Sequence, residues 1–218
     1  METLATALFG KRLLIFDFDG TIADTSPLHA RAFAQVLGSH GLTVDYPAIA
    51  GRETRDAIRS SFALAGRPEP DDVTIAELTR AKRALVREFF ASDLRPLPEV
   101  DAFLRWARGR YSLALATSGS RATVEPALRQ LGYAGWFMRT VFAEDVARGK
   151  PAPDSFLAAL GDVPAAEALI FEDSDSGFLG ANRAGIHWIN APVAFAPGIF
   201  DLEALQAAVA AGPIPAGR

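Results

Sequence analysis

The chain has 218 residues, of which 50% are hydrophobic and 22% are charged, and its formal net charge at pH 7 is −4. This composition is typical of a globular protein with a sizeable core, and the acidic balance argues against a nucleic-acid or anionic-membrane binder. The absence of cysteine excludes disulfides, thiolate catalysis and zinc–cysteine sites.

The amino-terminal segment lacks the order of a signal peptide, because its basic pair, Lys11 and Arg12, follows the first apolar stretch. The chain has no apolar run of about 18 residues, so we expect no membrane span. A soluble cytoplasmic protein is the expectation.

Five short apolar runs predict buried β-strands, and helix-like segments separate them. In chain order the runs are RLLIFD, YSLALATS, TVFAED, ALIFED and IHWINA. From residue 100 onward, helices are predicted over residues 100–108, 120–131, 154–160, 177–184 and 201–211. Buried strands that alternate with helices indicate an α/β fold, in which a doubly wound parallel sheet carries helices on both faces. Ligands of such sheets bind beyond the carboxyl ends of the strands.

The alternation stops between Ser26 and about residue 94, where no convincing strand is present. Ser26 followed by Pro27 is a good helix start, and further helices are predicted over residues 54–65 and 71–92. We interpret this region as a small all-α domain inserted after the first strand. The predicted domains are residues 1–24 and 96–218 for the α/β core and residues 25–95 for the helical insert.

The first predicted strand runs into two aspartates, Asp17 and Asp19, in the sequence LLIFDFDGT. On an extended strand the two carboxylates share one face, roughly 7 Å apart along the chain. At the end of a buried strand they repel each other unless a cation, a proton or hydrogen bonds compensate. A magnesium ion meets this need, and Gly20 allows a sharp turn beside it. The alternative is a strand end with two solvated aspartates.

A second acidic pair, Glu172 and Asp173, follows the predicted strand ALIF. If the two strands are neighbours, Asp173 can supply a second acidic ligand to the same metal. The alternative is an ordinary acidic loop, in which Asp175 caps the next helix.

Groups suited to an anion lie between the two acidic pairs. Thr117 ends the strand LALAT, and Ser118 and Gly119 follow it, so a hydroxyl and backbone amides are available at a strand end. Lys150 precedes Pro151 and a second proline, which restrict the backbone after it. Taken singly, these are an ordinary turn and a surface lysine.

The order of these groups along the chain indicates phosphoryl transfer. Together they supply a nucleophile, a metal site, and positive and hydrogen-bonding partners for a dianion. Asp17 could attack phosphorus and form an aspartyl-phosphate. Asp19 could protonate the leaving oxygen and then deprotonate the attacking water, a role that typically contributes about a hundred- to ten-thousand-fold in rate.

DFDGT, the threonine of LATSGS, KPAPD and FEDSDSG, in this order, resemble the four motifs of the haloacid dehalogenase (HAD) superfamily. The resemblance covers nearly the whole chain and implies a Rossmann-like core with a type-one helical cap. DTSPLHARAF, RPLPEVDAFL and VARGKPAPDSF are similar to the β-phosphoglucomutase-like sugar phosphatases.

The resemblance implies roles for the acidic residues. Asp17 is expected to be the nucleophile and a ligand of one Mg²⁺ ion, for which Mn²⁺ is an alternative. Asp19 is expected to be the acid–base, with its backbone carbonyl on the metal. Asp173 is the expected acidic metal ligand, with Glu172 as a second candidate.

The resemblance also implies that Thr117 and the amides near Ser118 and Gly119 hold the phosphoryl group. Lys150 is expected to neutralise the phosphoryl oxygens and Asp17.

Three residues of the insert are candidates for substrate contact. His29 lies one turn after the start of the first insert helix, and relatives often have a histidine there that faces the active site. Arg52 and Arg55 lie in a loop that could reach the cleft. Each of the three has a structural or surface alternative.

We therefore expect a Mg²⁺-dependent phosphatase of small phosphomonoesters, in particular sugar phosphates, that works as a monomer through an aspartyl-phosphate. A mutase of the β-phosphoglucomutase type is the main alternative, because it would share nucleophile and metal. A phospho-accepting signalling domain and a binding module are further alternatives. A phosphonate hydrolase would need a Schiff-base lysine in the insert; Lys82 is the only lysine there, and its charged helix argues against that role.

Overall fold

The computed structural model describes residues 3–50 and 52–212, and its core is a five-stranded parallel sheet with the strand order β3-β2-β1-β4-β5. The strands are β1 Leu13–Phe16, β2 Ser112–Ala116, β3 Arg139–Val141, β4 Ala168–Glu172 and β5 His187–Asn190. Four of them lie within predicted runs, and β3 begins one residue before the run TVFAED, so the predicted α/β fold is confirmed. The central strand, β1, is completely buried, as a strand covered on both faces should be.

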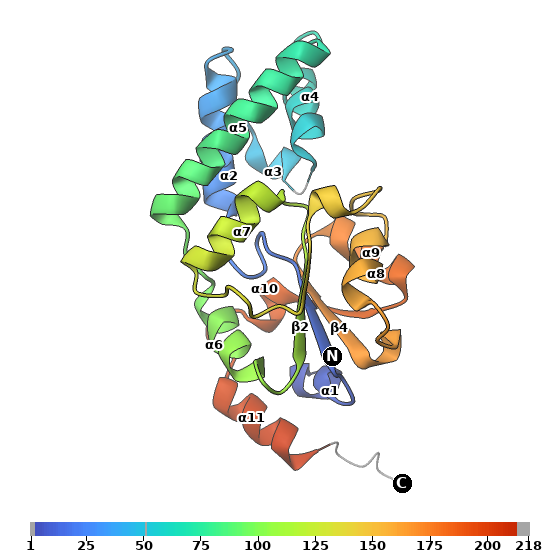
Figure 1. The fold of residues 1–218 in the computed structure, drawn as a ribbon. Helices are drawn as coiled ribbons and strands as arrows, with labels where there is room; N and C mark the ends of the chain where they lie inside the picture. The colour runs from blue at the N-terminus through green and yellow to red at the C-terminus, as the bar shows by residue number, and fades with distance from the viewer. Residues whose placement is uncertain (1–2, 51, 213–218) are drawn as a thin grey trace.

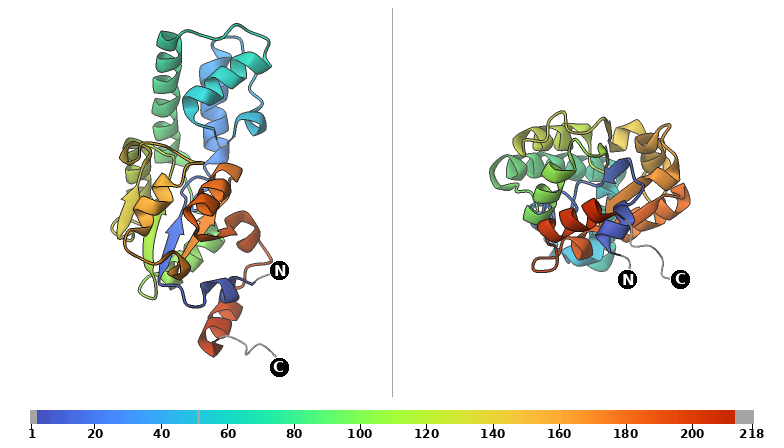
Figure 2. Two further views of the ribbon diagram at one scale, coloured as in Figure 1. Left: turned by 90° about the vertical axis from the view of Figure 1, so that its right-hand side faces the viewer. Right: turned by 90° about the horizontal axis from the view of Figure 1, so that it is seen from below.

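Helices cover both faces of the sheet (Figures 1 and 2). The core helices are α1 Leu4–Leu8, α6 Pro98–Ala107, α7 Arg121–Gln130, α8 Asp154–Leu160, α9 Asp175–Ala184, α10 Ala191–Ala194 and α11 Leu202–Ala211, with 3-10 turns η1 Ala143–Asp145 and η2 Ala165–Glu167. Since successive strand residues point to opposite faces, Leu14 and Phe16 pack with Phe103 of α6, whereas Leu13 and Ile15 pack with α8. The sheet is therefore doubly wound.

Four helices between β1 and α6 form what we call the helical insert: α2 Ser26–Gly38, α3 Tyr46–Ile49, α4 Thr54–Leu64 and α5 Asp72–Asp93. They stack on one end of the core (Figure 1) and share a hydrophobic cluster of their own, which includes Phe33, Leu37, Ile58 and Ile75. The chain leaves the core after β1 and returns before α6. These two connections lie side by side, because Leu97 donates its backbone N–H to the carbonyl of Ile22 at 2.9 Å.

The predicted division at residues 24–25 and 95–96 lies close to these two connections and stays a prediction. The short helices α1, α3 and α10 have four or five residues each, too few for a helical period to stand out in the sequence. Among the residues that the structure describes, no helix is long and apolar enough to cross a membrane.

Candidate active site

Three neighbouring strands deliver polar side chains to one edge of the sheet. In the register of the sheet, Phe16 of β1 lies beside Leu115 of β2 and Phe171 of β4. Asp17, which follows Phe16, donates its backbone N–H to the carbonyl of Phe171 at 3.0 Å. Asp17, Thr117 and Glu172 therefore share the carboxyl edge of the central strands, where α/β sheets bind their ligands. All three are buried.

Lys150 joins the first and the second acidic pair. Its Nζ lies 2.5 Å from Oδ1 of Asp17 and 2.6 Å from Oε2 of Glu172, and its side chain is only 4% exposed. Burial alone would lower the pKa of Lys150, but the charges of Asp17 and Glu172 outweigh it and raise the pKa above its ordinary value. Lys150 is therefore a permanently charged, buried cation, and the surface alternative is wrong.

Both carboxylate oxygens of Glu172 are occupied by donors. Oε1 accepts hydrogen bonds from the backbone of Asp173 and Ser174 and from the Ser174 hydroxyl, at 2.9–3.1 Å. Oε2 receives Lys150. Gly177 of α9 packs so tightly here that a Cβ atom would collide with the Glu172 carboxylate. These contacts fit a residue that holds Lys150 in place, and metal ligation by Glu172 stays a prediction.

Asp17, Glu172 and Asp173 together form an acidic cluster that fits a divalent cation. One carboxylate oxygen from each lies within 4.8 Å of the others. Burial first, and then the neighbouring carboxylates, raise the pKa of Asp17 well above its ordinary value and that of Asp173 to about 7. Hard oxygen donors that repel one another in the absence of a cation are the donor set that Mg²⁺ prefers. Gly20, at a φ of 77°, lies against Asp173 and leaves no room for a side chain.

The turn after β2 brings its backbone close to Asp19. The N–H of Gly119 donates to Oγ1 of Thr117 at 2.9 Å. A Cβ atom at Gly119 would lie 3.2 Å from that oxygen and 3.6 Å from Oδ2 of Asp19. The Thr117 hydroxyl, the exposed Ser118 and Gly119 thus border the same space as the second aspartate. This is the arrangement of amides and a hydroxyl that suits an anion.

Asp19 is linked to the helical insert through His29 and Lys82. Oδ1 of Asp19 lies 3.1 Å from Nε2 of His29, and Nδ1 of His29 lies 2.7 Å from Nζ of Lys82. Since an ammonium group only donates, Nδ1 accepts from Lys82, and a neutral His29 carries its proton on Nε2 and donates it to Asp19. Burial tends to raise the pKa of Asp19, but the hydrogen bonds from His29 and Thr25, together with the positive charge of Lys82, outweigh it and lower the pKa.

Lys82 is a buried lysine of the helical insert, although its helix is rich in charged residues. It is only 5% exposed, and burial lowers its pKa to about 8. The signal was present in the periodicity, because Leu78, Lys82 and Val86 follow one another at intervals of four along α5. A lysine on the apolar stripe of a helix needs a buried partner, which here is His29.

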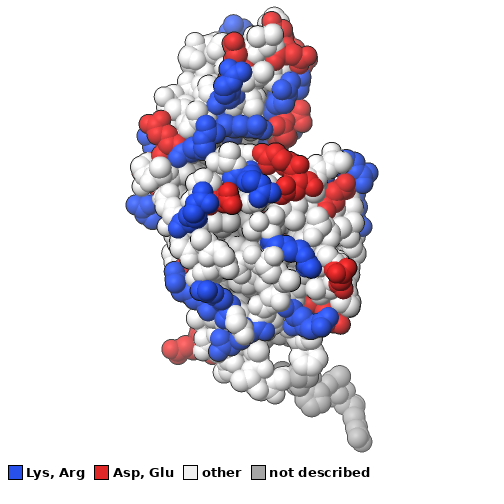
Figure 3. All heavy atoms as spheres, in the orientation of Figure 1, with Lys and Arg blue, Asp and Glu red and all other residues white. Residues whose placement is uncertain are grey.

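The two candidate arginines of the insert are engaged within the insert or exposed. Arg55 lies 3.5 Å from Asp72, and its backbone N–H donates to Glu53 at the start of α4. Arg52 is exposed after α3. Within the described ranges, no contact joins either arginine to the core carboxylates. Figure 3 shows the insert surface with basic and acidic side chains close together, as expected for such internal pairs.

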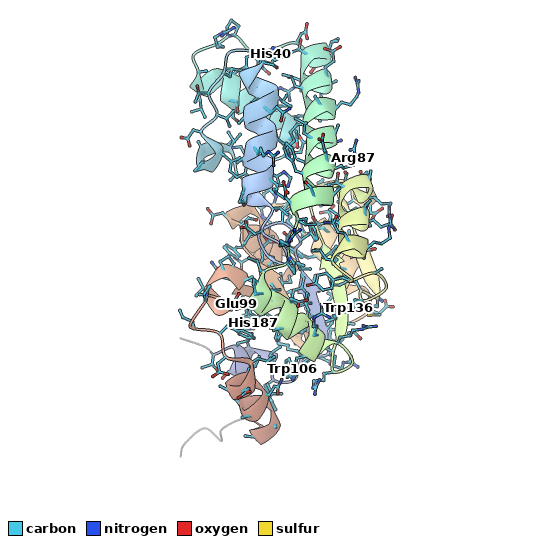
Figure 4. The ribbon with its side chains drawn as sticks, turned by 90° about the vertical axis from the view of Figure 1, so that its left-hand side faces the viewer. His40, Arg87, Glu99, Trp106, Trp136 and His187 are labelled. Carbon is cyan, nitrogen blue, oxygen red and sulfur yellow. The ribbon has the colours of Figure 1, made fainter. Side chains whose placement is uncertain are left out.

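The other two histidines of the described residues, His40 and His187, lie away from the site. His40 is exposed at the end of α2, and Figure 4 shows it at the end of the insert farthest from the core. His187 is the first residue of β5, on the amino edge of the sheet opposite the acidic cluster.

Comparisons with known proteins show that this chain is similar to hydrolases. Residues 14–191 match the model of the haloacid dehalogenase-like hydrolase family. The fructose-1-phosphate phosphatase YqaB of Escherichia coli K12 is 37% identical over 175 residues, which cover 79% of this chain and 92% of that protein. Protein CbbY of Rhodobacter capsulatus is 33% identical over 203 residues, covering 86% and 88% of the two chains.

A solved structure of similar fold carries a phosphorylated sugar. The crystal structure of a CbbY variant from Rhodobacter sphaeroides in complex with xylulose-(1,5)bisphosphate matches with a TM-score of 0.71 and 28% identity. The match covers 82% of this chain and 84% of that one.

Proposed function

The chain belongs to the haloacid dehalogenase-like hydrolase family, and from this premise we propose that it is a Mg²⁺-dependent phosphatase of sugar monophosphates that forms an aspartyl-phosphate on Asp17. One observation carries the proposal: Lys150 bridges the carboxylates of Asp17 and Glu172, and one carboxylate oxygen of Asp173 lies within 4.8 Å of an oxygen of each. A buried carboxylate that faces a fixed cation and a metal site is suited to attack a phosphoryl group, whose negative charge would otherwise repel it.

Asp17 is the proposed nucleophile. Lys150 holds Oδ1, so the carboxylate has one orientation, and the second oxygen remains for attack on phosphorus. The carboxylates of Asp17 and Asp173 and the backbone carbonyl of Asp19 would hold Mg²⁺. The ion supplies positive charge to the phosphoryl oxygens when it is bound.

Thr117, Ser118 and Gly119 are the proposed phosphoryl-binding group. The Thr117 hydroxyl already accepts from the Gly119 amide, which leaves its own proton for a phosphoryl oxygen. With Lys150 on the other side, the phosphoryl oxygens would meet donors from two directions. Such preorganised donors stabilise the charge that develops in the transition state.

Asp19 is the proposed acid–base. It borders Gly119, so it is near the proposed phosphoryl position, and it has no hydrogen bond to Lys150 among the described contacts. As an acid it would protonate the departing alcohol oxygen, and as a base it would then take a proton from the water that hydrolyses the aspartyl-phosphate. His29 donates to its Oδ1 and keeps the carboxylate oriented between the two steps.

The proposed substrate class comes from the relatives. The Escherichia coli relative is named a fructose-1-phosphate phosphatase, and the CbbY structure contains a sugar bisphosphate. Both compounds have a phosphate ester on a sugar carbon, and this is the group that the core residues of this chain would transfer. A mutase would use the same core residues, so the fate of the phosphoryl group decides between the two activities.

The test is product analysis with purified protein, Mg²⁺ and a panel of sugar monophosphates that includes fructose 1-phosphate and β-glucose 1-phosphate with a trace of its bisphosphate. We expect free phosphate, in amounts equal to the dephosphorylated sugar, and loss of this release with EDTA. Formation of glucose 6-phosphate without free phosphate would establish the mutase instead. The absence of any conversion would overturn the proposal.

A further inference from the structure

The turn after β2, residues 117–120, lies against the chain that follows β3, and we call it the phosphoryl turn. The pairing of β2 with β3 continues past the ends of both strands, because Thr117 donates its backbone N–H to the carbonyl of Val141 at 3.0 Å. Two residues farther along each segment, Ala143 donates its N–H to the carbonyl of Gly119 at 3.1 Å. The phosphoryl turn is therefore in contact with η1, which begins at Ala143.

Arg121 joins the phosphoryl turn to η1 through its side chain. It is the first residue of α7, directly after the turn, and its Nη2 lies 2.8 Å from both carboxylate oxygens of Asp145, the last residue of η1. The backbone N–H of Arg121 donates to the Glu144 carboxylate at 3.1 Å. Among the described contacts, the Ser120 side chain makes no capping bond to α7, so η1 supplies an acceptor that a helix cap would normally supply.

The ion pair between Arg121 and Asp145 is held on both sides. Oδ2 of Asp145 also accepts the backbone N–H of Phe142 at 3.0 Å. The Phe142 ring is buried, and the guanidinium carbon of Arg121 lies 4.3 Å from its centre. Ion pairs at a surface usually contribute little, unless their geometry is fixed or several groups form a network. Here a buried ring lies under the cation and a backbone amide binds the anion, which restricts both side chains to one arrangement.

The position of the phosphoryl turn determines where its amides point. A peptide group is planar, with its N–H opposite its carbonyl, so the bond from Ala143 to the Gly119 carbonyl also sets the direction of the Ser120 N–H. Amides stabilise a developing charge only if they are preorganised toward it, and a displacement of about 1 Å can cost about a hundredfold in rate. A contact that fixes this turn can therefore control the rate without touching the substrate.

We propose that Arg121 and Asp145 are positioning residues, whose ion pair fixes the phosphoryl turn against η1 and so aims its amides at the phosphoryl oxygens. The proposal rests on the proposed phosphatase function. Both side chains act through the backbone of residues 117–120. Because every substrate presents the same phosphoryl group to this turn, loss of the pair should affect all substrates alike.

The test compares Arg121→Met, Asp145→Asn and the double variant with the wild type. An asparagine has one oxygen, so it cannot accept from both Phe142 and Arg121. We expect each single change to lower kcat by about 10- to 50-fold with little change in KM, and by the same factor for a sugar monophosphate and for phenyl phosphate. The double variant should lose no more than the larger single loss, because both changes remove one link.

A binding measurement tests the same link without turnover. Orthovanadate with Mg²⁺ imitates the five-coordinate phosphorus of the transition state, and calorimetry gives its affinity. We expect this affinity to fall in both single variants by about the factor lost in kcat. Arg121→Lys keeps a cation that can reach Asp145, so it should recover most of the rate and of the affinity.

Arg129→Met is the matched control, since Arg129 lies on the same helix, α7, and its 3.8 Å pair with Glu125 is largely exposed. It should change neither rate nor affinity, and thermal melting should show that every variant is folded. A loss in Arg121→Met without a loss in Asp145→Asn would overturn the proposal, because Arg121 would then act without its partner. Losses that add in the double variant, or that differ between the two substrates, would overturn it too.

The two proposals fail in different ways. A wild type that hydrolyses no phosphate ester but binds orthovanadate would overturn the proposed function, and the affinities of the variants would then decide whether the ion pair positions the turn. A wild type that neither hydrolyses an ester nor binds orthovanadate would overturn both.

Discussion

Nζ of Lys82, on α5 of the helical insert, lies 2.7 Å from Nδ1 of His29, and this contact determines which nitrogen of the histidine faces Asp19. The proposed acid–base of the core is thus oriented by an ammonium group from the insert. Lys82 has no aqueous surroundings to which it could turn instead, because it is only 5% exposed.

We predict that Lys82→Met lowers kcat by about 10- to 100-fold. The methionine fills the same space but cannot donate to Nδ1, so His29 loses its fixed tautomer and Asp19 its oriented partner. Steady-state phosphate release measures the effect. Arg83→Met is the matched control, since Arg83 is the next residue on α5 and its pair with Glu53 is largely exposed. If the two variants have the same kcat, the orientation and tautomer of His29 do not depend on Lys82.

Lys150 is predicted to stabilise the fold as well as the site. Lys150→Met leaves two buried carboxylates, Asp17 and Glu172, without their cation, which typically costs about 3–5 kcal/mol of unfolding free energy. The cost should be largest near pH 8 and smaller near pH 5, because the carboxylates can then take up protons. Urea denaturation in EDTA at both pH values measures it.

Arg148→Met provides the comparison, because the pair of Arg148 with Asp154 lies on the surface. Exposed pairs of this kind contribute about 0.2–1 kcal/mol, at either pH. A Lys150 variant as stable as the Arg148 variant at pH 8 would contradict the buried triad.

Asp173 makes the stability of the metal-free protein depend on pH. Burial first, and then Glu172, raise the pKa of Asp173 from its ordinary value of 3.8 to about 7, so the folded protein binds more protons than the unfolded chain between these values. The contribution of this group to stability is therefore complete below pH 4 and is lost as the pH rises through about 7. We expect the melting temperature in EDTA to fall over that range.

Magnesium should reverse this trend, because it binds the deprotonated carboxylate. The rise in melting temperature on addition of Mg²⁺ should be larger at pH 8 than at pH 5.5, and Asp173→Asn should abolish most of it. Asp175→Asn removes an exposed carboxylate two residues away and should keep the effect. A Mg²⁺ shift that is equal in the Asp173 and Asp175 variants would place the metal elsewhere.

Gly177 is predicted to be irreplaceable although it lies in a helix, where alanine is normally the better residue. In Gly177→Ala the new Cβ atom would collide with the Glu172 carboxylate and push it away from Lys150. We expect a loss of about 1–3 kcal/mol in stability from the overpacking, together with a large drop in activity. Urea denaturation and phosphate release measure the two effects.

Gly38→Ala is the control for a helical glycine without such a neighbour, because it lies at the end of α2 with nothing within 4 Å of an added Cβ. It should be neutral or slightly stabilising. Similar behaviour of the two alanine variants would mean that Glu172 can move without consequence.

The sequence allowed the sheet and its carboxyl edge to be predicted, because both are local. LLIF and ALIF are continuous apolar runs that end in carboxylates, and parallel strands bring such ends together. Asp17, Thr117 and Glu172, which follow or end such runs, could therefore be assigned to one site before their distances were known. Lys150 lies in a loop, and only the order of the motifs and the resemblance to the family assigned it to the same site.

Contacts between elements far apart in the chain could not be predicted in this way. The burial of Lys82 depends on a histidine 53 residues earlier. Oε1 of Glu172 accepts from the backbone amides of Asp173 and Ser174, which point at it only when the turn before α9 has formed. Local patterns contain no information of this kind.

The central claim is that Asp17 carries the phosphoryl group during turnover. Mass spectrometry of the protein, acid-quenched within milliseconds of mixing with sugar monophosphate and Mg²⁺, tests it directly. We predict that the peptide with Asp17 gains the mass of one phosphoryl group, and that Asp17→Asn shows neither this gain nor phosphate release although it melts as a folded protein. Phosphate release by a folded Asp17→Asn variant, or a phosphoryl group on another residue, would contradict the account.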